Sequence, residues 1–80
     1  MTVSVQVSVY ALRQPRLGPA IEVVRGALEE WGLNPEVGPM STVATGEIEV
    51  VFAALKEGFI RAAETGHVVM TVVLSNVCPG

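Results

Sequence analysis

Charge is missing from both ends of this 80-residue chain, since no charged residue precedes Arg13 and none follows Glu64. The stretch 37–46 is uncharged as well, so all acidic and basic residues fall in two central segments and beside them. A sheet with one face in water normally carries charged side chains on that face. We therefore expect these neutral segments to form a surface that is covered, either by another subunit or by a ligand with several hydrogen-bonding groups.

Residues suited to catalysis or metal binding are also scarce. The chain has one cysteine, one histidine and no aspartate, so it has no intrachain disulfide and no evident metal site. Its five basic residues form no basic stripe, which argues against a nucleic-acid partner. No apolar run is long enough to span a membrane. A lone cysteine and no recognisable export signal favour a cytoplasmic location.

The length predicts a single domain, residues 1–80. A chain of this size buries only about 60% of its unfolded surface. Half of the residues are nevertheless hydrophobic. Because this is more apolar surface than so small a core can hide, we expect a homodimer or homotetramer.

The first half of the chain predicts a strand followed by a helix. Residues 2–10 alternate between valines and a neutral polar set, which is typical of a half-buried strand; the polar set is Thr2, Ser4, Gln6, Ser8 and Tyr10. A helix follows, with Pro19 in its first turn and Gly32 at its C-terminal stop. Its apolar stripe recurs at steps of three and four: Leu17, Ile21, Val24, Leu28 and Trp31.

The second half predicts two strands, a helix and a last strand. Pro35 and Pro39 bracket a short edge strand, and Gly38-Pro39 forms a hairpin to a second strand at 41–45. A helix opens at Gly46, with Glu47 and Glu49 in its first turn. It buries a second stripe: Val51, Phe52, Leu55, Phe59 and Ala62. Gly66 ends this helix, and a β-branched strand covers 67–77.

The resulting order, β-α-β-β-α-β, predicts an α+β fold. The specific expectation is a ferredoxin-like sandwich, in which two helices cover one face of an antiparallel four-stranded sheet. A looser α+β arrangement of the same elements is the alternative. In either case the valines of the first strand face the helices, and its polar residues lie on the open face.

Candidate catalytic residues have simpler structural interpretations. His67 stands at a strand start, far in sequence from any partner residue. Cys78 is the one possible nucleophile, but Cys-Pro-Gly is typical of a strand that ends in a turn. Glu47 is explained by its place at a helix N-terminus. We expect no enzyme, and the enzymatic hypothesis would depend on Cys78 or Glu47.

The polar face of the first strand is the best candidate site. Gln6, Ser8 and Tyr10 supply neutral donors and acceptors, and the Tyr10 ring can pack on a flat heterocycle. The pattern alone leaves two interpretations open. This face either binds a small ligand or forms an interface between subunits.

Several segments in order along the chain resemble those of YkoF-like thiamine- and hydroxymethylpyrimidine-binding proteins. They are Ser8-Val-Tyr, Met40-Ser-Thr-Val-Ala-Thr-Gly-Glu, His67-Val-Val-Met and Ser75-Asn-Val-Cys-Pro-Gly. The resemblance covers nearly the whole chain. It implies a ferredoxin-like fold, an oligomer, and binding of thiamine or its aminopyrimidine part without catalysis.

The hypothesis is therefore a non-enzymatic binder of thiamine (vitamin B1) or its hydroxymethylpyrimidine moiety, with no other cofactor and no metal. Neutral amides and hydroxyls can satisfy an aminopyrimidine without burying a protein charge. The expected ligand-binding residues, on the sheet face away from the helices, are Gln6, Ser8, Ser41, Thr42 and Asn76 through hydrogen bonds and Tyr10 through its ring. The alternative is a ligand-free oligomeric interaction or regulatory module.

Overall fold

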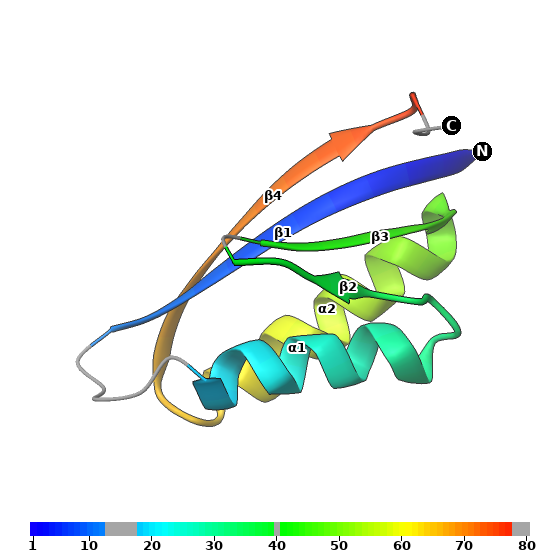
Figure 1. The fold of residues 1–80 in the computed structure, drawn as a ribbon. Coiled ribbons are helices and arrows are strands. Elements are labelled where there is room, and N and C mark those ends of the chain that lie inside the picture. The colour runs from blue at the N-terminus through cyan, green and yellow to red at the C-terminus, as the bar shows by residue number, and fades with distance from the viewer. Residues whose placement is uncertain (13–17, 40, 78–80) are drawn as a thin grey trace.

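The computed structural model describes residues 1–12, 18–39 and 41–77 (Figure 1). The elements within these ranges are β1 (Thr2–Leu12), α1 (Gly18–Glu30), β2 (Glu36–Val37), β3 (Thr42–Glu47), α2 (Ile48–Ala63) and β4 (His67–Ser75). The predicted order β-α-β-β-α-β is therefore confirmed. None of the helices in the described ranges is long and apolar enough to cross a membrane.

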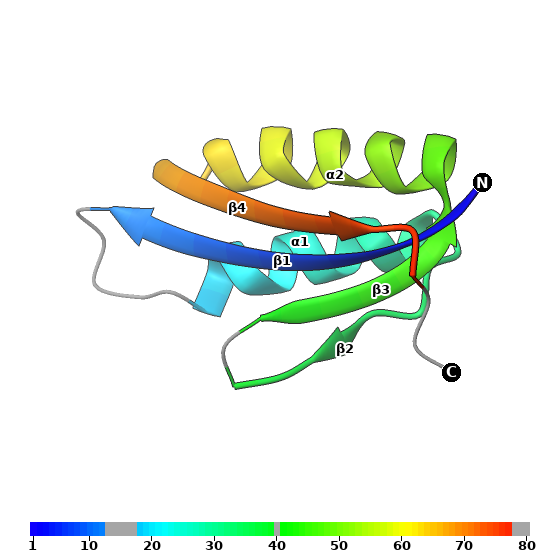
Figure 2. The same cartoon turned by 90° about the horizontal axis from the view of Figure 1, so that it is seen from above.

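The strands form one antiparallel sheet in the order β2-β3-β1-β4, and both helices cover the same face of it (Figures 1 and 2). This is the ferredoxin-like sandwich that the sequence predicts. The long strand β1 lies in the middle, paired with β3 on one side and with β4 on the other. A hydrogen bond from the Gly38 amide to the Ser41 carbonyl, 2.8 Å long, closes the predicted hairpin between β2 and β3.

The core lies between the sheet and the helices. Alternation along β1 turns four valines toward the helices, where each is buried: Val3, Val5, Val7 and Val9. The helices contribute Ala20, Val24, Ala27 and Leu28 from α1, and Val51, Ala54, Leu55 and Ala62 from α2. No helix of the described ranges covers the opposite face of the sheet, which is called the open face below (Figures 1 and 2).

The prediction that Trp31, Phe52 and Phe59 belong to the buried stripes is wrong. The two helices pack against each other through small residues instead. Phe52 and Phe59 are 54% and 42% exposed, whereas the buried stripe of α2 includes Ala54 and Gly58. A Cβ atom at Gly58 would lie 3.4 Å from the Cβ of Ala27 in α1, so this flank has no room for a phenyl ring. Trp31 follows the last residue of α1 and is exposed as well.

The start of α2 also differs from the expectation. Gly46 and Glu47 belong to β3, and the helix begins at Ile48. The Glu47 carboxylate accepts hydrogen bonds from the Met1 amine at 3.0 Å and from the Thr2 hydroxyl at 3.1 Å. These two interactions lower the pKa of Glu47. Glu49 does lie in the first turn, as predicted.

Gly46 is held close to the core. A Cβ atom there would overlap the buried side chain of Leu33, which follows α1. Glycine at this position therefore lets β3 end against the segment after α1.

Candidate functional site

A cavity of about 190 Å³ lies where the pairing between β1 and β3 stops. The last paired residues are Val7 and Thr42, but β1 continues to Leu12 with only β4 beside it. The opening left next to the second half of β1 is bounded by the hairpin before β3 and by α1. Its lining consists of Val7, Ser8, Val9, Tyr10, Ile21, Val24, Val37, Gly38, Pro39, Ser41 and Thr42.

Thr42 is the polar residue buried most deeply at this cavity. It is the direct partner of Val7 in the antiparallel ladder, and directly paired residues share a face of the sheet. Thr42 therefore points to the helix side, so the expectation that it shares the open face with Gln6 and Ser8 is wrong. It is only 5% exposed.

The Thr42 hydroxyl has no hydrogen-bond partner in the part of the chain that the structure describes. Most buried polar side-chain atoms do have a partner, whether protein or ordered water. A hydroxyl that lines a cavity and is left without one can receive or donate a hydrogen bond to a molecule inside.

Ser41 is adjacent in the chain and links the cavity to the open face. The Gln6 amide nitrogen donates to the Ser41 hydroxyl oxygen at 3.0 Å. Because a hydroxyl can accept and donate together, Ser41 keeps its own proton for a further acceptor. Gln6 itself lies on the open face and does not line the cavity, so it would act on a cavity ligand through Ser41.

Ser8 and Tyr10 also line the cavity, although alternation places their side chains on the open face. Tyr10 is 48% exposed and stands opposite Val69 of β4. We therefore expect β1 to border the cavity at these positions mainly through its backbone. The structure thus gathers Ser8, Tyr10, Ser41 and Thr42 around one cavity.

Asn76 is not part of this group. It follows the end of β4, where Ser75 pairs with Ser4, whereas the cavity lies beside residues 7–10 of β1. Cys78 lies outside the described residues. Within the described ranges, no three His, Cys, Asp or Glu side chains gather where they could hold a metal ion.

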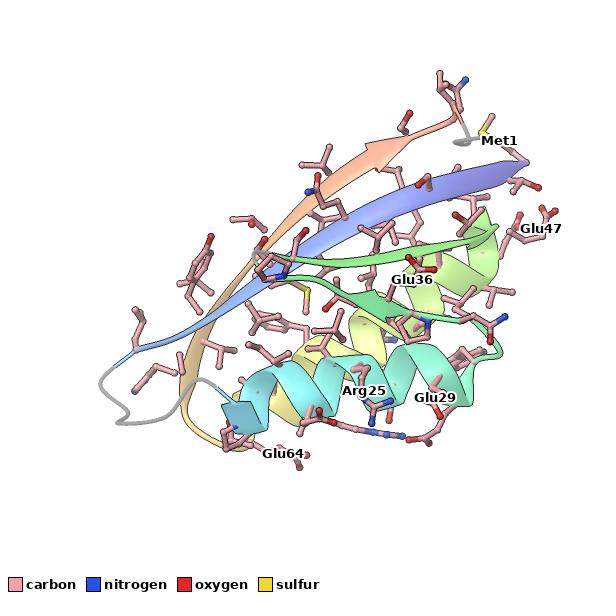
Figure 3. The ribbon with its side chains drawn as sticks, in the orientation of Figure 1. Met1, Arg25, Glu29, Glu36, Glu47 and Glu64 are labelled. Carbon is pink, nitrogen blue, oxygen red and sulfur yellow. The ribbon has the colours of Figure 1, made fainter. Side chains whose placement is uncertain are left out.

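Among the described residues that line the cavity, none is charged. Arg25 pairs with Glu22 and Glu29 on the surface of α1, as Figure 3 shows for Glu29. On the open face, Glu36 and Glu47 stand only at the margins, on β2 and at the end of β3 (Figure 3).

A second ion-pair group joins the two helices. Arg61 of α2 pairs with Glu30 of α1 at 2.6 Å and with Glu57 of its own helix at 3.1 Å, and it lowers the pKa of the Glu30 carboxyl. The described lining of the cavity is therefore uncharged, with apolar walls and a few hydroxyl and backbone groups. Such a site suits a flat neutral ligand with several hydrogen-bonding atoms.

The sequence did not reveal the apolar walls of this cavity as part of a site. Ile21 and Val24 read as ordinary core positions of α1, and Val37 as part of an edge strand. One signal in the sequence could have indicated the cavity. The strand predicted at 41–45 is shorter than the first strand and cannot pair along its whole length.

The structure defines a small ferredoxin-like fold with a cavity whose described lining is uncharged. The YKOF-related family matches residues 2–80, and the chain belongs to this family. No curated protein matches the chain.

Solved structures agree with the fold. A Streptococcus pneumoniae protein is 27% identical, with a TM-score of 0.85 over 99% of this chain and 89% of its own. A Thermotoga maritima protein, provisionally assigned to thiamine biosynthesis or salvage, is 24% identical, with a TM-score of 0.83 over 96% and 85%. A hypothetical protein of Methanocaldococcus jannascii is 18% identical, with a TM-score of 0.86 over 99% and 84%.

Proposed function

We propose that this protein binds thiamine or its hydroxymethylpyrimidine moiety without catalysis, in the cavity between β1, α1 and the β2–β3 hairpin. The observation that carries the proposal is the buried Thr42 hydroxyl, which lines the cavity and has no partner in the described chain. Membership of the YKOF-related family and the thiamine assignment of the Thermotoga maritima relative support the choice of ligand.

The size of the cavity favours one ring over the whole vitamin. Its volume of about 190 Å³ is below the roughly 300–1,000 Å³ of pockets that enclose drug-sized ligands. We infer that the aminopyrimidine ring enters the cavity. The Thr42 and Ser41 hydroxyls would then bind its ring nitrogens or exocyclic amine, and the thiazolium part of thiamine would remain outside.

Binding without catalysis fits the chemistry of the lining. The cavity offers hydroxyl and backbone groups, and its described lining contains neither His67 nor any carboxylate. Burying an unpaired protein charge against a ligand is costly, and neutral partners avoid this cost. The roles of Gln6, Ser8, Tyr10 and Asn76 in binding, and the cytoplasmic location, stay predictions of the sequence.

Isothermal titration with three ligands tests the proposal. Hydroxymethylpyrimidine and thiamine should both bind, whereas the isolated hydroxyethylthiazole should not, because only the pyrimidine enters the cavity. Equal binding of the thiazole would contradict the placement of the ring. No heat of binding with any of the three would contradict the function.

A ligand-free interaction module is the second candidate, and one observation favours it. The open face carries exposed valines among its neutral polar residues, notably Val43 at 36% and Val73 at 61% exposure. Such a face can pack against another protein surface. The same titrations distinguish the two candidates, since a pure interaction module binds none of the three ligands.

A further inference from the structure

The two hydroxyl side chains at the start of β3 reach the cavity from opposite sides of the sheet. Thr42 pairs with Val7 and points to the helices. The Ser41 hydroxyl lies on the side of the open face, where it meets Gln6, the direct partner of Val43. Both hydroxyl residues line the cavity, because β1 continues beyond the point where β3 stops (Figure 1). A ring inside the cavity can therefore contact both hydroxyls at once.

The Gln6 amide gives the Ser41 hydroxyl a fixed polarity. The amide nitrogen donates to the Ser41 oxygen at 3.0 Å. Because an amide nitrogen only donates, the hydroxyl oxygen accepts in this bond and the serine proton must point elsewhere. Among the described residues, no acceptor binds that proton. Ser41 therefore presents a hydrogen-bond donor to the cavity.

The surroundings of Gln6 favour this bond, and Thr42 has no comparable restraint. The residues directly opposite Gln6 are Val43 on β3 and Val73 on β4, and neither side chain offers the amide a competing partner. The Thr42 hydroxyl has no partner in the described chain, so it can donate or accept as a ligand requires. Of the two hydroxyls, Ser41 alone has a polarity that the protein sets, and it can therefore discriminate between ligands.

We propose that Gln6 makes the cavity selective for a flat heterocycle that presents an unprotonated ring nitrogen to Ser41. This inference rests on the proposed function for the position of the ring, and it adds which edge of the ring is recognised. An aminopyrimidine carries such a nitrogen directly beside its exocyclic amine. Ser41 donates to the nitrogen and the amine donates to Thr42, so that two adjacent ligand atoms meet two consecutive residues.

The oxo analogue of hydroxymethylpyrimidine, in which a carbonyl oxygen replaces the exocyclic amine, has the same outline and the opposite polarity. Its adjacent ring nitrogen carries a proton. Thr42 adapts by donating to the carbonyl, but at Ser41 the ring proton meets the serine proton, and one of the two is left without an acceptor. A ring in a cavity of about 190 Å³ has little room to shift and exchange its edges. Since a buried donor without a partner is costly, the oxo analogue should bind roughly 5- to 150-fold more weakly.

Isothermal titration of hydroxymethylpyrimidine and its oxo analogue at neutral pH tests the role of Gln6. Gln6→Glu keeps the length of the side chain, but a carboxylate only accepts, so it takes the Ser41 proton and leaves the serine oxygen to accept from the ligand. The wild type should bind hydroxymethylpyrimidine more tightly, and Gln6→Glu should bind the oxo analogue more tightly. Thr45→Glu places the same charge on the open face of β3, opposite Ser4, and should keep the wild-type order of affinities.

A second variant, Ser41→Ala, tests the same inference without a new charge. It removes the hydroxyl that reads the ring nitrogen, so the preference for hydroxymethylpyrimidine should disappear. Circular dichroism checks that each variant is folded. The wild-type preference persisting in Gln6→Glu or in Ser41→Ala, or its reversal in Thr45→Glu, would overturn the inference. Equal binding of the two ligands by the wild type would overturn it as well and leave the proposed function standing, whereas binding of neither ligand would contradict the proposed function itself.

Discussion

Replacing Thr42 with valine tests the cavity most directly. Valine has nearly the shape of threonine but lacks the hydroxyl, so Thr42→Val removes one polar group from a side chain that is 5% exposed. Leaving a buried hydrogen-bonding group of the ligand unpaired costs about 1–3 kcal/mol. At about 1.4 kcal/mol per factor of ten, the affinity for hydroxymethylpyrimidine should fall roughly 5- to 150-fold.

The same substitution should have the opposite effect on the free protein. Burying a hydroxyl without a partner costs about 1–3 kcal/mol in protein mutational data, and valine does not incur this cost. Water that enters the cavity recovers part of it, so the free energy of unfolding should be unchanged or should rise by at most that amount. The prediction is thus a weaker binder that is at least as stable as the wild type.

Titration calorimetry and urea unfolding measure the two effects, and Thr45→Val is the matched control. Thr45 lies on the same strand but on the open face, opposite Ser4, and it is exposed. Its substitution should leave ligand affinity unchanged. If Thr42→Val bound the ligand as tightly as the wild type, or if Thr45→Val were the weaker binder, the cavity would not be the site.

Three more substitutions probe the support around this site. Gly46→Ala should cost about 1–3 kcal/mol in urea unfolding, because a methyl group there overlaps a buried leucine. Gln6→Ala, which removes the donor to Ser41, should weaken ligand binding roughly 5- to 150-fold by calorimetry; equal affinity would show that this link is not used. Arg61 lowers the pKa of Glu30 below its ordinary 4.5, so the ion pair stabilises the fold above that pH and is lost as the pH falls through the folded-state pKa. Arg61→Met should therefore have a lower free energy of unfolding than the wild type at neutral pH, and the difference should narrow as the pH falls. A difference that stays the same at acid pH would show that the ion pair contributes nothing.

Much of the fold follows from periodicity, which a sequence displays directly. The valines of β1 alternate with polar residues, and this alone indicates which residues of β1 face the helices. The order of the elements then predicts the ferredoxin-like sandwich. For Thr42 the sequence was insufficient, because the face it occupies depends on the register between β3 and β1. A shift of one residue would have placed Thr42 on the open face.

The candidate site was predictable in its chemistry but not in its position. The neutral hydroxyl residues near the start of β3 and along β1 are visible in the sequence, and four of the six predicted residues line one cavity. That cavity exists because β3 stops pairing at Val7 while β1 continues to Leu12. A difference between strand ends of this kind depends on where the hairpin turns, and boundaries are the least certain part of any prediction from periodicity.

The apolar residues of α2 show why sequence alone misplaced Phe52 and Phe59. They lie about 100° around the helix from Val51 and Gly58, so the apolar arc of α2 is too wide to define one buried stripe. Contact with α1 decides the matter, since the absence of a side chain at Gly58 lets the two helices approach closely. Once that flank faces α1, the phenylalanines must face the free edge of β4. The exposure of Phe52 and Phe59 is therefore a consequence of the small residues through which α2 contacts α1, and periodicity within α2 alone does not contain that information.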